Sequence, residues 1–420
     1  MTDLWDSDLK QWTDTRARAL GFDLSGIAPV EGLTDPTEAL DAQRFEAWID
    51  AGRAGDMDYL KRRDGAGRLL RSSVQVSHPW ANSVLVCAMS YRTPGPLSVD
   101  QAPPTSGWIA RYAWSGRSPD TWSGRSPAAA ADAPATPPAP APLDPADYHD
   151  FLLERLEHLA RDLGERAGGS TRCYVDTGPL VERSFAARAG IGWIGKNTCV
   201  LNQQNGSWLL LGVILSSLRV PPPVAALVSS LGSTDRCGSC TRCLDACPTG
   251  ALTAPRQMDA SLCIAYLTIE KKGTIPLALR APMGRQVFGC DICQDVCPWN
   301  RHTASAADPR IPTRPELVNP DLSWLAAMDA PTFKLWFKGS PLDRTRRSRL
   351  HRNVAIAMGN SGQRQFLPQL QAWSAGEDPV LAEAAAWAIE SLESSAAPHA
   401  KPPSAAARDQ TPDARPPSTG

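Results

Sequence analysis

Eight of the eleven cysteines lie within residues 237–298, and their spacing is typical of iron–sulfur ligands. The first four form a C-x2-C-x2-C-x3-C-P run: Cys237, Cys240, Cys243 and Cys247, followed by Pro248. In runs of this type three thiolates ligate one cluster and the fourth ligates another. The spacing therefore predicts two clusters and a second group of cysteines further along the chain.

That second group is present at residues 290–298, as a C-x2-C-x3-C-P run. Val287 stands where a complete repeat would have its first cysteine, and Cys263 is available to replace it. Eight thiolates then make two [4Fe–4S] clusters with none left over. We assign Cys237, Cys240, Cys243 and Cys297 to the first set, and Cys247, Cys263, Cys290 and Cys293 to the second set.

Structural zinc and disulfide bonds are the alternative uses of these cysteines. Zinc sites use cysteine pairs, but rarely two successive two-residue gaps followed by x3-C-P. Disulfides belong to oxidising compartments, and the start MTDLWDSDLK has neither the basic nor the apolar region of a signal peptide. No run of about 18 apolar residues could span a membrane. We therefore expect a soluble, cytoplasmic protein, and a monomer.

The clusters need a scaffold, and a length of 420 residues predicts several domains. We expect an α+β multidomain protein with an N-terminal α/β domain (1–220), a bacterial ferredoxin-like domain with two [4Fe–4S] clusters (221–312) and a helical region (313–394). Pro- and Ala-rich stretches at residues 115–144 and 395–420 predict a disordered insertion and a disordered tail. The net charge of −1 means that nucleic-acid binding would need a local basic patch.

The N-terminal part has clear element signals. Helices are expected at residues 7–20 and 36–51, and a buried strand at 84–89 contains Cys87 as a core residue. A further helix should begin with Asp144 as its N-cap and present an apolar face from Tyr148 to Leu163.

Residues 173–200 form the densest signal outside the cysteines. A strand at 173–175 should deliver Asp176 to the carboxyl edge of an open α/β sheet, with Thr177 capping the next helix. A G-x-G-x-x-G pattern follows at 190–195. It comes after a helix and leads into a strand at 208–215, which is the wrong context for a nucleotide fingerprint. We expect these glycines to let backbone approach another flat or anionic ligand.

The region from residue 317 to 393 should be helical, with a stacked helical pair at about 347–358 and 380–391. Residues 334–352 contain seven basic side chains: Lys334, Lys338, Arg344, Arg346, Arg347, Arg349 and Arg352. From charge alone they form either an ordinary solvated face or a phosphate-binding surface.

Taken together, these segments resemble the epoxyqueuosine reductases, which modify tRNA. The matching pieces are IARYA (109–113), DYH (147–149), VDTGPLVER (175–183), GWIGKNT (192–198), GSW (206–208), the eight cysteines, CIAYLTIE (263–270) and RNVAIAMGN (352–360). One departure is that more than thirty residues separate IARYA from DYH, whereas the family has only a few there.

The resemblance implies cofactors, a reaction and partners. It implies cobalamin in the N-terminal domain, which in this family is similar to that of reductive dehalogenases, and a HEAT-like C-terminal repeat. The two clusters would pass electrons from a flavodoxin or ferredoxin system to the cobalt, and epoxyqueuosine at the tRNA wobble position would be reduced to queuosine. Candidate cobalamin contacts are Arg68, Tyr112, Asp176, Lys196, Thr198 and Ser207. The basic helix and residues 266–272 are candidates for tRNA contacts.

Asp176 matches the proton donor of the family. An ordinary aspartate is ionised at neutral pH, so this role requires burial that raises its pKa. A carboxylate at a helix start would have a lowered pKa instead. Two other functions also stay open: a non-catalytic iron–sulfur electron carrier and a corrinoid reductive dehalogenase, although the chain shows no twin-arginine leader.

Overall fold

The chain is built around a four-stranded sheet, as seen in a computed structural model that describes residues 4–116, 147–222, 224, 235–301, 303, 308 and 313–394. The strands, in spatial order, are β1 (Leu24–Pro29), β2 (Ser83–Ser90), β7 (Leu209–Ser216) and β4 (Thr171–Tyr174). Each neighbouring pair is antiparallel. The expected open α/β sheet with a shared carboxyl edge is therefore wrong, because antiparallel neighbours end at opposite edges.

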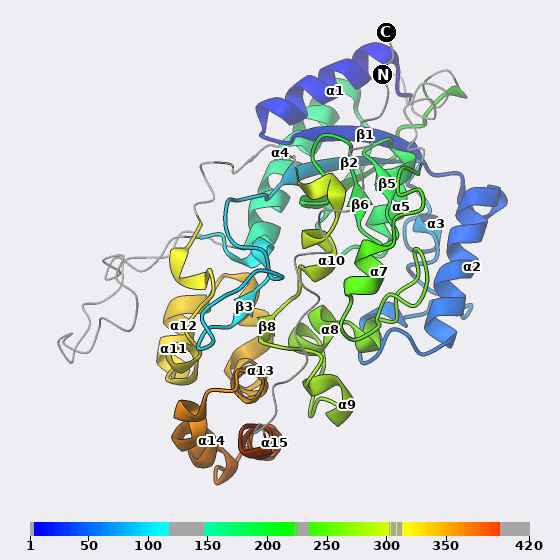
Figure 1. Cartoon of the computed structure of the whole chain (residues 1–420). Coiled ribbons are helices and arrows are strands. Elements are labelled where there is room, and N and C mark those ends of the chain that lie inside the picture. Colours follow the sequence, from blue (N-terminus) through cyan, green and yellow to red (C-terminus); the bar gives the residue numbers. More distant parts are fainter. Residues whose placement is uncertain are drawn as a thin grey trace.

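Helices cover both faces of this sheet (Figure 1). Alternate side chains of β2 point to opposite faces, so Leu85 packs with α1 (Ser7–Ala19) and α4 (Tyr148–Ala167), while Val86 packs with α5 (Glu182–Arg188). Cys87 is fully buried, which confirms it as a core residue. The helix predicted at residues 36–51 is α2 (Pro36–Asp50).

Two predicted helix starts are wrong. Asp147 caps α4 by accepting a hydrogen bond from the His149 backbone N–H, so the cap lies three residues after the predicted cap Asp144, which is outside the described residues. The helix after β4 begins at Glu182, not near Thr177. Asp176 has a φ of 55°, a left-handed conformation that interrupts regular structure directly after the strand. Most of the predicted insertion at 115–144 and all of the tail at 395–420 also lie outside the described residues.

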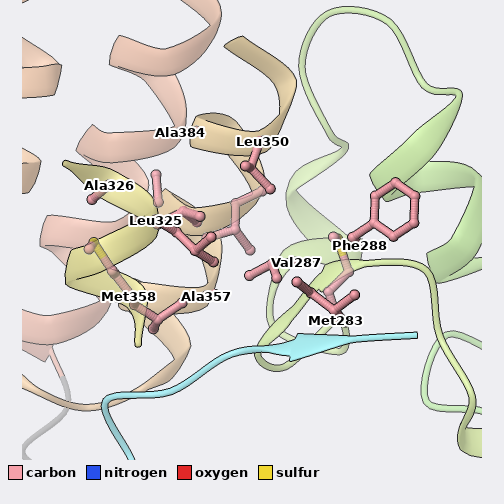
Figure 2. Packing of buried hydrophobic residues seen from close by; sticks show 14 of the residues in the cluster. Met283, Val287, Phe288, Leu325, Ala326, Leu350, Ala357, Met358 and Ala384 are labelled. Atoms are coloured by element: carbon pink, nitrogen blue, oxygen red, sulfur yellow. The ribbon is translucent and has the colours of Figure 1, made fainter. Parts of the chain in front are cut away.

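A short parallel ladder joins the N-terminal part to the cysteine-rich part. It pairs β3 (Trp108–Ile109) with β8 (Gln286–Phe288). One hydrophobic cluster surrounds this ladder and continues into the C-terminal helices, so that Val287 and Phe288 belong to the same cluster as Leu350 (Figure 2). The three predicted segments thus share a core, and their division into separate domains stays a prediction.

The cysteine-rich and C-terminal parts are mainly helical. Their helices are α7 (Arg242–Ala246), α8 (Ile264–Ile269), α9 (Leu277–Arg280), α10 (Ile292–Asp295), α11 (Leu322–Ala326), α12 (Ala330–Phe337), α13 (Arg346–Asn360), α14 (Leu367–Ser374) and α15 (Pro379–Ser394). Helices α13 and α15 pack closely, because a Cβ at Gly359 would lie 2.8 Å from the Ala388 Cα. This is the predicted helical pair, but a HEAT-like repeat stays a prediction. Among the described residues, no helix combines the length and apolar character needed to cross a bilayer.

Asn353 connects α13 to the cysteine-rich part from inside the core. Its side-chain amide is fully buried and donates to the backbone carbonyls of Thr268 and Val287, each at 2.9 Å. Asn353→Ala should lower the free energy of unfolding by about 2–4 kcal/mol, since two buried carbonyls lose their donor. Urea denaturation under anaerobic conditions measures this change. Ser348→Ala, at an exposed position of the same helix, is the control, and equal destabilisation of both variants would contradict the prediction.

Candidate functional site: cysteine sets and an acid-lined cavity

The division of the eight cysteines into two sets stays a prediction, which the neighbours of individual thiols support. In the first set, burial and the neighbouring thiols of Cys240 and Cys237 raise the pKa of Cys243 to about 11. Burial also raises the pKa of Cys297 to about 12, and Cys237 and Cys243 are again contributing neighbours. In the second set, burial raises the pKa of Cys290, with Cys263 and Cys247 as neighbours.

All eleven cysteines are free thiols, so no disulfide competes for them. Several thiols assigned to one set are also electrostatic neighbours of one another. This arrangement fits two [4Fe–4S] clusters.

The GWIGKNT segment holds both cysteine sets in place. Lys196 Nζ donates to the backbone carbonyls of Gly238 and Cys240 at 2.6 and 2.9 Å, next to the first set. The Asn197 amide donates to the carbonyl of Cys293 in the second set at 3.4 Å. The glycines allow the chain to pack closely on itself: a Cβ at Gly192 would lie 2.1 Å from the carbonyl oxygen of Leu201, and one at Gly195 would lie 2.4 Å from Leu201 Cδ1. Their expected role in the approach of a ligand stays a prediction.

A cavity of about 570 Å³ lies beside the second set. Its wall includes Ile269 at the end of α8, the helix that Cys263 caps, and Phe288, two residues before Cys290. The rest of the wall comes from five other segments: Tyr59, Arg62, Leu70, Arg71, Tyr112, Tyr148, His149, Asp176, Thr177, Pro179, Glu270, Pro341 and Arg344. The cavity is thus next to the segments that carry the second set and is lined by both acidic and basic groups.

Asp176 is the centre of a polar group on this wall. The Tyr148 hydroxyl donates to Asp176 Oδ2, and His149 Nε2 lies 3.2 Å from the same oxygen. On the other side of the imidazole, His149 Nδ1 lies 2.6 Å from Asp147 Oδ1. The side chain of Asp176 is 51% exposed, towards the cavity, whereas His149 and Asp147 are buried. The arrangement is a carboxylate–imidazole–carboxylate chain that ends at the cavity, in which His149 Nε2 is within ion-pair distance of Asp176 but has no hydrogen bond to the residues that the structure describes.

In this chain, the contacts of Asp176 and His149 with neighbouring side chains together shift their pKa values more than burial does. Desolvation would raise the pKa of Asp176, but His149 and Tyr148 outweigh it and hold the pKa below its ordinary value. Desolvation would lower the pKa of His149, but Asp147 and Asp176 outweigh it and raise the pKa. The pKa of Asp176 is therefore lowered in the protein without cofactor, and the raised pKa expected beneath a bound corrin stays a prediction. The lowering comes from side-chain partners and not from a helix start, and the proton of this group is favoured on the imidazole.

The predicted cobalamin contacts do not all meet at one place. Tyr112 and Asp176 line the cavity. Arg68 pairs with Asp64 at 2.8 Å and lies off the wall, whereas Arg62 and Arg71 of the same segment lie on it. Three other residues also lie elsewhere: Lys196 holds the first cysteine set, Thr198 accepts hydrogen bonds from Arg183, and Ser207 is buried against Gln294 and Asn300.

Several wall residues were missed from the sequence. His149 and Tyr148 belong to the DYH segment, and a histidine beside a carboxylate at a helix start was the available signal. Tyr59 is exposed at the wall, and its ring lies 5.8 Å from the Arg71 guanidinium carbon. Nothing local marks Tyr59, because its position depends on the packing of distant segments.

The basic segment 334–352 divides into structural and exposed cations. Arg352 is buried and donates to backbone carbonyls of Leu267, Lys271 and Gly273. Arg349 donates to four carbonyls, including those of Ile269 and Glu270. The remaining members are exposed: Lys334, Lys338, Arg344, Arg346 and Arg347. In the 266–272 segment, Tyr266 is buried and Lys271 pairs with Asp56 at 2.9 Å, which leaves Lys272 exposed.

Fold and site together define a redox enzyme with a double iron–sulfur ligand set beside an acid-lined cavity. Family models agree: residues 236–300 match a 4Fe-4S double cluster binding domain, and residues 71–118 match "Epoxyqueuosine reductase QueG, DUF1730". The epoxyqueuosine reductase of Vibrio cholerae is 33% identical over 386 residues, which is 91% of each chain. That of Pseudomonas aeruginosa is 35% identical, covering 87% of this chain and 88% of that protein. The chain belongs to the epoxyqueuosine reductase family.

Solved structures show the same likeness. An epoxyqueuosine reductase crystallised with an epoxyqueuosine-modified tRNA-Tyr stem loop has a TM-score of 0.74 at 28% identity, covering 92% of this chain and 90% of that one. The Bacillus subtilis enzyme, solved with its catalytic aspartate loop swung out of the active site, has a TM-score of 0.72 at 28% identity and the same coverage. A catabolic reductive dehalogenase reaches only 0.36 at 14% identity, which is too low to support an argument.

Proposed function

We propose that this chain reduces epoxyqueuosine to queuosine at the wobble position of tRNA. The observation that carries the proposal is the cavity, whose wall joins Asp176 to the segments that hold Cys263 and Cys290. Reduction of an epoxide to an alkene consumes two electrons and two protons and releases water. Two iron–sulfur clusters would deliver the electrons, and the chain from Asp147 to Asp176 would deliver protons at the opposite side of the cavity.

We further propose that cobalamin binds in this cavity, with Tyr112 and Asp176 on its wall. When bound, it supplies a strongly reducing cobalt centre for opening the epoxide. Arg62 and Arg71 replace Arg68 as the basic contacts, because they line the cavity and Arg68 does not. The clusters would be reduced by a flavodoxin or ferredoxin system. The cytoplasmic location and the monomeric state stay predictions.

For the tRNA we propose the exposed cations at and after the cavity rim. Arg344 lines the cavity, and Lys338, Arg346 and Arg347 are exposed in the same segment. Unpaired anticodon nucleotides expose base edges and faces, so a flipped wobble base can enter a cavity while phosphates contact the rim. Arg349 and Arg352 are excluded from this surface because backbone carbonyls occupy their guanidinium groups.

The test is direct. The protein, purified without oxygen and loaded with cobalamin, is incubated with epoxyqueuosine-containing tRNA and a reductant, and the nucleosides are then analysed by mass spectrometry. We expect queuosine to form and a cob(II)alamin signal to appear in electron paramagnetic resonance spectra. Cluster signals without product and without a cobalamin signal would instead identify an electron carrier.

A further inference from the structure

Arg344 is the only basic residue of the segment 334–352 on the described cavity wall, where Pro341 of the same segment also lies. It lies on the turn Pro341–Thr345, directly before α13. Arg349 fixes this turn by donating to the backbone carbonyls of Arg344 and Thr345 and to that of Ile269 on the cavity wall. The backbone position of Arg344 is therefore set by the core, while its side chain is 47% exposed.

The guanidinium of Arg344 contacts the proton-bearing chain of the site. Arg344 Nη2 lies 3.5 Å from Asp147 Oδ2. The other carboxylate oxygen, Asp147 Oδ1, contacts the His149 ring. At 3.5 Å the contact is long for an ion pair, and the guanidinium is 47% exposed, whereas Asp147 is buried and has a second partner in His149. A phosphate, with its charged oxygens, can therefore take the guanidinium away without leaving Asp147 unpaired.

We infer that Arg344 is a positioning residue that couples tRNA binding to the proton chain: it pairs with Asp147 in the free protein and moves to a tRNA phosphate in the complex. The inference rests on the proposed function and extends it. The inference requires that the Arg344 guanidinium pair first with Asp147 and then with a phosphate. The exposure of the guanidinium and its long contact with Asp147 permit this exchange.

The electrostatic consequence follows from the groups around His149. These are Asp147 and Tyr148 on α4, Asp176 after β4, Tyr112, Arg344, and the wall residues Tyr59, Arg62, Arg71 and Glu270. Arg344 contributes to lowering the pKa of both Asp147 and Asp176. When a phosphate neutralises Arg344, the pKa values of Asp147 and Asp176 rise. The chain from Asp147 through His149 to Asp176 then stays protonated up to a higher pH. Binding of substrate therefore favours the protonated chain that epoxide reduction needs.

The first experiment compares pH profiles of the cobalamin-loaded enzyme. The profile of kcat/KM reports the free enzyme, and that of kcat reports the complex. As the pH rises, the kcat/KM of the wild type should fall first, and its kcat should fall at a higher pH. In Arg344→Gln the two falls should nearly coincide, because the free chain has already lost its cation. Arg344→Lys should restore the separation, and Arg347→Gln, an exposed neighbour outside the cavity, should retain it.

The second experiment does not use turnover. Titration calorimetry with an unmodified anticodon stem loop, in buffers of different ionisation enthalpy, counts the protons taken up on binding. The wild type and Arg347→Gln should take up protons at slightly alkaline pH, and Arg344→Gln should take up fewer. Equal uptake in all three proteins, or an equal loss in both variants, would overturn the inference. If no queuosine forms from modified tRNA but this pattern holds, the proposed reaction fails and the coupling stands.

Discussion

Cys243→Ala will reduce the iron content of the anaerobically purified protein from about eight atoms to about four and will abolish epoxide reduction. A [4Fe–4S] cluster needs all four thiolates, and the thiols of Cys240, Cys237 and Cys297 surround Cys243. Losing one cluster breaks the electron path to the cavity. Iron analysis and electron paramagnetic resonance measure the loss, and nucleoside analysis measures turnover.

Paired variants test how the cysteines are divided between the clusters. Cys243→Ala with Cys297→Ala should again remove only about four iron atoms, because both belong to the first set. Cys243→Ala with Cys263→Ala should remove about eight. Cys173→Ala is the matched control, since Cys173 lies on β4 in the sheet, outside both sets, and should keep all the iron. If the two double variants lost the same amount of iron, the assignment would be wrong.

Asp176→Asn should lower the rate of epoxide reduction by about 10²- to 10⁴-fold while the iron content stays unchanged. Asparagine preserves the size of the side chain but can neither hold the ionised charge opposite His149 nor pass a proton into the cavity. The Tyr148 hydroxyl and His149 both lose a charged acceptor at the same oxygen. Single-turnover reduction of modified tRNA, with the clusters already reduced, isolates this step.

The control for Asp176 is Asp150→Asn. Asp150 is exposed in the first turn of α4, one residue after His149, and is not on the cavity wall. It removes the same charge in the same neighbourhood without touching the chain from Asp147 to Asp176. Turnover by Asp176→Asn at the rate of the control would show that the carboxyl group has no part in proton delivery.

The sequence predicted the strands of the sheet and the presence of a double iron–sulfur domain better than it predicted the cavity. Strand β2 could be located because a six-residue apolar run has few alternatives, and its alternating side chains fill both faces of the sheet. The direction of the strands could not be read in the same way, since pairing depends on segments more than a hundred residues apart, as in β2 with β7. The start of the helix after β4 was misplaced because Asp176 turns the chain with a positive φ.

The roles of the basic residues likewise depend on the tertiary structure. Seven cations within 19 residues look alike in the sequence, yet Arg352 is buried in the core, Arg349 braces a turn, and only Arg344 reaches the cavity. Their roles depend on which backbone carbonyls lie opposite them. The carbonyls that bind Arg352, and two of the four that bind Arg349, belong to α8 and its following loop, about eighty residues earlier in the chain.

The sequence alone determined the iron–sulfur chemistry, because cluster ligation depends on cysteines at short, fixed intervals that one stretch of chain carries complete. Only the tertiary structure decided where the reaction can occur and how its acid is charged. The cavity wall takes Arg62, Tyr112, His149, Asp176 and Arg344 from separate segments, and the pKa of Asp176 follows from the neighbours that folding places beside it. The spacing of residues within one stretch is enough to identify cluster ligands. Contacts between side chains that are distant in the sequence form only when the chain has folded.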